Sequence, residues 1–117
     1  MAGATGTVAA GRVPGPAWAQ HAIWWHVYPL GFTGAATDGS SAEAGRGLRH
    51  LVGWLDHLVG FGANGLLLGP VFHSTTHGYD TLDHLRVDAR LGGDEQLDEL
   101  VAAAHARGVR VLLDGVF

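Results

Sequence analysis

The stretch GANGLLLGPVF, residues 62–72, decides the fold of this chain. It contains a short apolar run, residues 65–71, after a Gly-Ala-Asn-Gly turn, and Pro70 stands near its end, which is typical of a buried strand. Directly before it, apolar residues at helical spacing predict an amphipathic helix at about 46–60. The residues that carry this spacing are Leu48, Leu51, Val52, Leu55, Leu58 and Val59. Gly60 and Gly62 are expected to end the helix.

A second strand is predicted on the N-terminal side of this unit. The sequence IWWHVYPL, residues 23–30, is dense in β-branched and aromatic residues and stops at Pro29. It lacks a polar and apolar alternation, so we expect this strand to be buried on both faces. Trp24, Trp25 and Tyr28 are therefore interpreted as core residues. The following Gly- and Ala-rich residues, 31–45, are expected to form a loop.

A second helix and a third strand are predicted on the C-terminal side. Asp94 is expected to cap a helix at about 95–107, and residues 109–113 form another apolar run. Apolar strands joined by amphipathic helices indicate parallel β-α-β units. We therefore expect three adjacent parallel strands with both helices on one face of the sheet. An open doubly wound sheet and the first part of a (β/α)8 barrel both fit this order, and length alone does not decide between them.

Composition excludes several classes of protein. The 117 residues contain no cysteine and carry a formal net charge of −4, so neither a thiolate zinc site nor a nucleic-acid-binding surface is expected. No apolar run approaches the ~20 residues of a membrane helix. Residues 1–22 lack the apolar stretch of a signal peptide, so we expect a flexible extension and a cytoplasmic protein without membrane partners.

The long polar segment 72–93 is the first candidate for a functional site. Connections of this kind usually have about 2–6 residues, and long ones at the carboxyl ends of parallel strands are where barrel enzymes build their sites. His73 and His77 are four residues apart, but Gly78 places them in a loop and no third ligand has a recognisable spacing, so no metal site is predicted.

Within this segment, HGYDTLDHLRVD, residues 77–88, allows two interpretations. In the structural one, the loop packs Tyr79 and Leu82 beneath it, and Asp80 and Asp83 form turns. In the functional one, the flat face of Tyr79 contacts the apolar side of a pyranose while His and Asp side chains bond its hydroxyls. Asp114, directly after the third strand, is likewise either a site residue or a turn former.

Four stretches together resemble the start of the α-amylase superfamily, glycoside hydrolase family 13. They are IWWHVYPLGF (23–32), GANGLLLGPVF (62–72), HGYDTLDHLRVDARLG (77–92) and HARGVRVLLDGVF (105–117). The resemblance implies a (β/α)8 barrel that acts on α-glucosidic bonds by a retaining mechanism. The family's catalytic carboxylates follow strands four, five and seven, so no catalytic residue is expected in this chain.

The resemblance assigns roles to three residues. Tyr79 matches the family tyrosine that stacks on the glucosyl ring, His77 matches a residue beside that ring, and Asp114 matches the third-strand aspartate that orients the pocket. No metal ligand is implied in this chain and no cofactor is required by it, while calcium dependence of a complete enzyme stays open.

The resemblance predicts that residues 23–117 are the N-terminal portion of a catalytic barrel, the first three β/α units, truncated after strand three. The parent protein would be a glycoside hydrolase or transglucosylase with an α-glucan or α-glucoside substrate, and this chain alone would be inactive. One alternative is a non-catalytic carbohydrate-binding or interaction protein that keeps the fold. Another is an open flavodoxin-like domain, although GFTGAATDGSS lacks the spacing of a phosphate-binding loop. In a three-strand segment, the inward sides of certain apolar residues are expected to be partly uncovered: Ile23, Leu66, Leu68, Val111 and Leu113.

Overall fold

The computed structural model describes residues 15–38 and 45–117 of the chain. The expected flexible extension at 1–22 therefore lies outside the described residues over positions 1–14, and the expected loop at 31–45 lies outside them over positions 39–44. Residues Ala17–His21 form a 3-10 helix, η1, in which Trp18 meets the ring of Trp24 edge-on at 6.0 Å.

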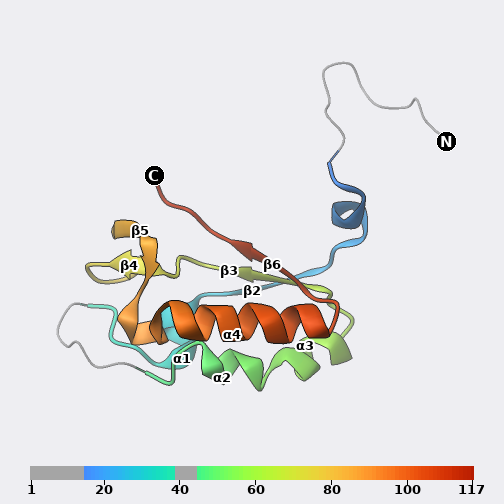
Figure 1. Cartoon of the computed structure of the whole chain (residues 1–117), viewed down its shortest axis with the longest axis horizontal. Helices are drawn as coiled ribbons and strands as arrows, with labels where there is room; N and C mark the ends of the chain where they lie inside the picture. The colour runs from blue at the N-terminus through green and yellow to red at the C-terminus, as the bar shows by residue number, and fades with distance from the viewer. Residues whose placement is uncertain (1–14, 39–44) are drawn as a thin grey trace, which may run out of the picture.

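A three-stranded parallel sheet forms the centre of the structure (Figure 1). Its strands are β2 (Trp24–Val27), β3 (Gly65–Leu68) and β6 (Arg110–Leu113), in the order β2-β3-β6. The predicted parallel, adjacent strands are confirmed, because β3 pairs in parallel with both neighbours. The register places Trp24, Gly65 and Arg110 side by side, so the three strands end together at Val27, Leu68 and Leu113.

The helices lie on one side of this sheet, as expected (Figure 1). They are α2 (Arg49–Val52), α3 (Leu55–Gly60) and α4 (Gly93–Ala106). The continuous helix predicted at 46–60 is wrong, because a turn at Gly53 and Trp54 divides it. Glycine is a poor helix former, and the leucine stripe stays buried across the break. The core therefore consists mainly of leucines from these helices against the sheet: Leu48, Leu51, Leu55, Leu58, Leu66, Leu68 and Leu100.

Asp94 does not cap the second long helix. The N-cap of α4 is Gly92, whose φ of 94° lies in the left-handed region that favours glycine. A Cβ at Gly92 would also come within 2.1 Å of the Gln96 side chain. Asp94 is instead the second residue of α4, and its Oδ1 accepts a hydrogen bond from the Val87 N–H at 2.9 Å. A cap motif alone could not reveal that the chain enters the helix through a glycine turn.

The sheet has one packed face and one open face. Leu66 and Leu68 are fully buried against the helices, so the expectation that their sides would be uncovered is wrong. Val111 and Leu113 share this face and are half-buried against the core. The uncovered face instead carries the intervening residues of the same register, His26, Leu67 and Leu112.

Two exposed side chains show how open the second face is. Leu112 is 46% exposed, and His26 is exposed as well. The prediction that the first strand is buried on both faces is therefore also wrong. An apolar run does not show which residues face the helices, because successive side chains point to opposite faces of a sheet.

Short elements occupy segments that were expected to be loops. Helix α1 (Pro29–Thr33) begins at Pro29, which suits the first turn of a helix. The strands β4 (Phe72–Ser74) and β5 (Thr81–Val87) form an irregular antiparallel hairpin, and a 3-10 helix, η2 (Ala89–Leu91), follows. The register shifts in this hairpin explain why the segment 72–93 shows no sustained periodicity. Over the described residues, no helix is long and apolar enough to cross a membrane.

Replacing Leu66 by alanine tests the one-sided core. We expect Leu66→Ala to lower the free energy of unfolding by about 2–5 kcal/mol, because it leaves a cavity between the sheet and the helices. Leu85→Ala is the matched control, since Leu85 is exposed on β5 and its loss should change that free energy by less than about 0.5 kcal/mol. Urea unfolding followed by circular dichroism measures both. Equal effects of the two substitutions would contradict this description of the core.

Candidate functional site

The candidate site lies at the carboxyl ends of the three parallel strands. The residues that follow the strands are Tyr28, Gly69 and Asp114. The Gly69 N–H donates to the Val27 carbonyl at 2.8 Å, and the Asp114 N–H donates to the Leu68 carbonyl at 3.0 Å, so the ladder continues to this edge. The hairpin of β4 and β5, which follows β3, lies at the same end of the sheet (Figure 1). Carboxyl ends of parallel strands are the usual place for binding residues in α/β folds.

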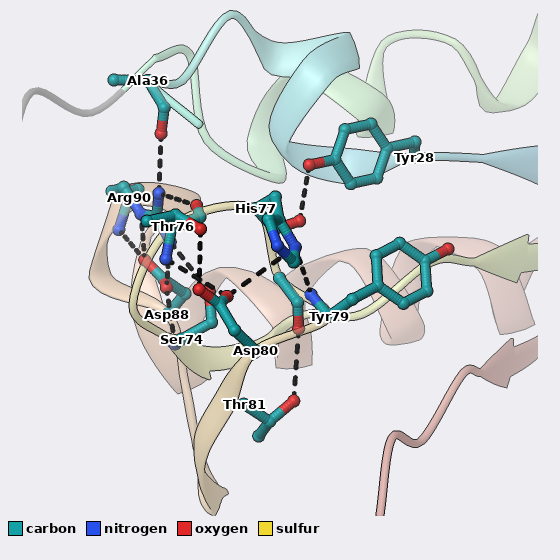
Figure 2. A network of polar contacts seen from close by, with 11 residues as sticks. Tyr28, Ala36, Ser74, Thr76, His77, Tyr79, Asp80, Thr81, Asp88 and Arg90 are labelled. Atoms are coloured by element: carbon teal, nitrogen blue, oxygen red, sulfur yellow. Dashed lines mark hydrogen bonds and ion pairs between the residues drawn. The ribbon is translucent and has the colours of Figure 1, made fainter. Parts of the chain in front are cut away.

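Tyr79 and His77 come together beside the end of β2 (Figure 2). The rings of Tyr79 and Tyr28 are offset-stacked, with centroids 6.3 Å apart and planes 23° apart. The His77 ring lies 6.3 Å from that of Tyr79, and its Nδ1 accepts the Tyr79 N–H at 3.2 Å. The Tyr28 hydroxyl donates to the His77 carbonyl at 2.5 Å. Two predicted site residues thus belong to one aromatic group.

The structural interpretation of this loop is wrong for its apolar side chains. Tyr79 is 46% exposed and Leu82 is 64% exposed, so neither is packed beneath the loop. Its prediction for Asp80 is confirmed, because this carboxylate accepts hydrogen bonds from the Thr76 N–H and hydroxyl across the turn. For Asp83 it is wrong, since Asp83 lies within β5, where its carboxylate accepts the Leu85 N–H. The turn at Asp80 therefore leaves the tyrosine ring available at the surface.

Asp80 is held as a carboxylate. The Thr76 hydroxyl, 2.6 Å from Oδ2, lowers the pKa of Asp80 to about 2, and the Thr76 N–H adds to this effect. His77 Nδ1 lies 3.8 Å from Oδ1 of the same carboxylate. Asp80 thus closes the turn that contains His77 and Tyr79.

A buried ion pair lies beside the start of this loop. Arg90 donates from Nε to Oδ1 of Asp88 at 2.9 Å and from Nη2 to Oδ2 at 2.8 Å, and both residues are buried. Burial alone would raise the pKa of Asp88, but the hydrogen bonds from Arg90 and from the Ser74 N–H lower it. Asp88 also caps η2 by accepting the Arg90 N–H.

The remaining donors of Arg90 reach two other segments of the chain (Figure 2). Nη2 donates to the Ser74 hydroxyl at 3.0 Å, while Nη1 donates to the carbonyls of Thr76 and of Ala36. Thr76 in turn bonds Asp80, so one guanidinium connects η2, the hairpin loop and the segment after α1. Neither Asp88 nor Arg90 was predicted as a site residue. A buried arginine gives no periodic signal in a sequence, and only its partners in space reveal it.

Asp114 lies at the same end of the sheet but apart from the aromatic group. It is half-buried, and the strand alternation gives it the same side as the exposed Leu112. Within the described part of the chain, no hydrogen bond joins its carboxylate to His77 or Tyr79. Across residues 15–38 and 45–117, no group of three or more His, Cys, Asp or Glu side chains could hold a metal ion.

Residues 26–117 match the sequence profile of the family described as "Alpha amylase, catalytic domain". This match covers most of the chain and includes the strand ends and the loop that form the site. The chain belongs to the alpha-amylase family.

Named relatives of this alpha-amylase family chain agree with the assignment. A cyclomaltodextrinase from a Bacillus species is 36% identical over 87% of this chain and 21% of its own length. The intracellular maltogenic amylase of Bacillus subtilis strain 168 is 33% identical over 87% of this chain and 20% of its own length. The chain thus spans about a fifth of these relatives.

Solved structures agree in fold. The debranching enzyme from Nostoc punctiforme superimposes with a TM-score of 0.77 at 30% identity, covering 91% of this chain and 26% of that one. A cyclic α-maltosyl-(1→6)-maltose hydrolase from Arthrobacter globiformis, in complex with that sugar, gives a TM-score of 0.73 at 31% identity over 89% and 27% of the two chains. The parallel sheet and its helices are therefore shared with one part of larger α-amylase-family enzymes.

The buried ion pair generates a stability prediction. Arg90→Met should lower the free energy of unfolding by about 3–5 kcal/mol, because it leaves the Asp88 carboxylate buried without its partner. Arg86→Met is the control, since Arg86 is solvent-exposed on β5 and lies 4.0 Å from Asp83. Denaturant unfolding measures both variants. A loss for Arg90→Met no larger than that for the control would show that the ion pair does not hold the loop.

The Asp80 carboxylate generates a pH prediction. Its pKa is lowered from 3.8 to about 2 in the folded chain, so its contribution to stability is complete above pH 3.8 and is lost as the pH falls toward 2. Asp80→Asn should therefore destabilise the protein at pH 5 and lose most of that effect at pH 2. Asp98→Asn, on the exposed face of α4, is the control and should show no such trend. Urea unfolding at both pH values measures the trend, which a pH-independent difference for Asp80→Asn would contradict.

Proposed function

We propose that this chain is the first three β/α units of the (β/α)8 barrel of an enzyme that cleaves or transfers α-glucosidic bonds, and that it carries part of the sugar site. One observation carries the proposal: an exposed tyrosine ring, with a histidine beside it, is held at the carboxyl ends of parallel strands in an alpha-amylase family chain. Such rings bind the apolar face of a pyranose, and neighbouring polar groups bind its hydroxyls.

In this proposal each predicted residue has a distinct role. Tyr79 offers one face of its ring to a glucosyl unit, while the Tyr28 ring stacks against it with centroids 6.3 Å apart. His77 supplies a hydrogen-bonding group beside that ring. Asp114, at the end of β6, faces the inside of the barrel and helps to orient the pocket.

The α-glucan or α-glucoside substrate class is supported by the relatives. The named relatives include a cyclomaltodextrinase and maltogenic amylases, and one related structure contains a cyclic maltosyl-maltose. One relative is called intracellular, which agrees with a proposed cytoplasmic location. Retaining cleavage needs two carboxylates about 5–5.5 Å apart on either side of the glycosidic bond. In the family pattern they follow later strands, so we propose that this chain binds sugar and that other segments of a longer protein perform the chemistry.

Substitution of Tyr79 tests the stacking role. In the complete enzyme, Tyr79→Ala should lower kcat/KM for maltooligosaccharides by about tenfold or more, which corresponds to about 1.4 kcal/mol. Tyr79→Phe keeps the ring face and should stay within about threefold of wild type. Leu82→Ala, which removes an exposed neighbour on β5, is the control and should have no effect. Equal damage from Phe and Ala at position 79 would exclude stacking as the role of the ring.

The proposed function also makes a prediction about the isolated chain. Purified residues 1–117 should release no reducing sugar from starch or maltotriose above the buffer rate, because no nucleophile and acid pair is assigned to them. Reducing-end assays over a range of protein concentrations measure this. Cleavage that scales with the concentration of this chain and survives further purification would overturn the proposed division of roles.

A further inference from the structure

Tyr28 is connected to the site in two ways that a core residue does not need. It follows the last residue of β2, and its half-buried ring was expected to belong to the core. Its ring does pack against the core cluster. Its hydroxyl, however, crosses to the hairpin loop and bonds the carbonyl of His77, 49 residues further along the chain.

The position of the Tyr28 ring is tightly defined. A Cβ on Gly31 would lie 2.8 Å from Cδ2 of the ring, and a Cβ on Gly69 would lie 3.5 Å from Cδ1. The ring therefore lies between the start of α1 and the end of β3, and a larger residue at position 31 would displace it. Burial raises the pKa of the Tyr28 hydroxyl, so the group stays protonated and able to donate at neutral pH.

The loop that carries His77 and Tyr79 is held at two separate points (Figure 2). Arg90 holds Ser74 and Thr76 at its beginning. Tyr28 holds residues 77–79 of the loop, through the His77 carbonyl and through the stacked ring of Tyr79. The first anchor fixes where the loop starts, and the second is in direct contact with the two residues assigned to the sugar.

We propose that Tyr28 is a positioning residue of the sugar site: its hydroxyl sets the backbone at His77, and its ring sets the tilt of the Tyr79 ring that receives the glucosyl unit. This inference rests on the proposed function for its consequence in turnover. The positioning itself is a property of the chain and can be measured without a substrate.

A double-mutant cycle in the complete enzyme separates positioning from a merely structural role. Tyr28→Leu should lower kcat/KM for maltooligosaccharides about tenfold in the wild-type background and about threefold or less in the Tyr79→Ala background, since only the part of its effect that passes through His77 remains there. Tyr28→Phe keeps the ring and loses only the hydrogen bond, so it should fall between wild type and Tyr28→Leu. Equal losses in both backgrounds would overturn the proposal.

Phe32→Leu provides the matched control. Phe32 is an aromatic residue of α1 whose ring packs against Trp25, Trp54 and His50, none of which belongs to the loop. We expect this variant to lower the melting temperature at least as much as Tyr28→Phe, while its kcat/KM stays within twofold of wild type. A loss of kcat/KM in Phe32→Leu equal to that in Tyr28→Leu would show that general destabilisation explains both, which overturns the proposal.

Amide hydrogen exchange keeps the test independent of activity. The Tyr79 N–H donates to His77 Nδ1, so Tyr28→Phe should speed exchange across residues 77–79 about fivefold and leave the amides of α4 unchanged. Unchanged exchange at 77–79 would overturn the positioning role. If wild-type enzyme cleaves no α-glucoside, the proposed function fails, and faster exchange at 77–79 would still support the positioning of Tyr79 by Tyr28.

Discussion

The buried pair of Asp88 and Arg90 is the constraint on which the functional end of this chain depends. An arginine side chain cannot lose its proton in a protein, so a buried guanidinium must be fully paired. Arg90 meets this requirement with the Asp88 carboxylate, the Ser74 hydroxyl and the carbonyls of Ala36 and Thr76. Because these groups come from separate segments, the pair fixes the long connection above the strand ends. The exposed rings of His77 and Tyr79 therefore belong to a loop that a buried ion pair holds in place.

The two faces of the sheet differ in how far they are covered. Its helix-facing side is closed by leucines, whereas the opposite side leaves His26 and Leu112 exposed. A parallel strand in a closed barrel is covered on both sides, by helices outside and by other strands inside. The open face is therefore consistent with the proposed role of this chain as one part of a barrel. Asp114 stands where that face meets the strand ends, which is the place for residues that contact a ligand in the proposed barrel.

Much of the fold could be predicted from the sequence, and the misses share a cause. The parallel order of β2, β3 and β6 followed from apolar runs alternating with helical leucine spacing. The hairpin of β4 and β5 was missed because its irregular register destroys the period-two signal. At the candidate site, the family resemblance of the HGYD motif pointed to His77 and Tyr79, whereas Tyr28 looked like one more aromatic residue of a buried strand.

The sequence by itself determined the parallel α/β class of fold, and its motifs pointed to His77 and Tyr79 as candidate site residues at the carboxyl end of the sheet. Hydrophobic spacing and local motifs contain that information, because they act over a few neighbouring residues. Only the tertiary structure decided which faces of the strands are covered, how Arg90 joins three segments, and that the Tyr28 hydroxyl reaches His77. These features join residues far apart in the chain, and a buried charge or hydroxyl finds its partners by position in space, which no local pattern records.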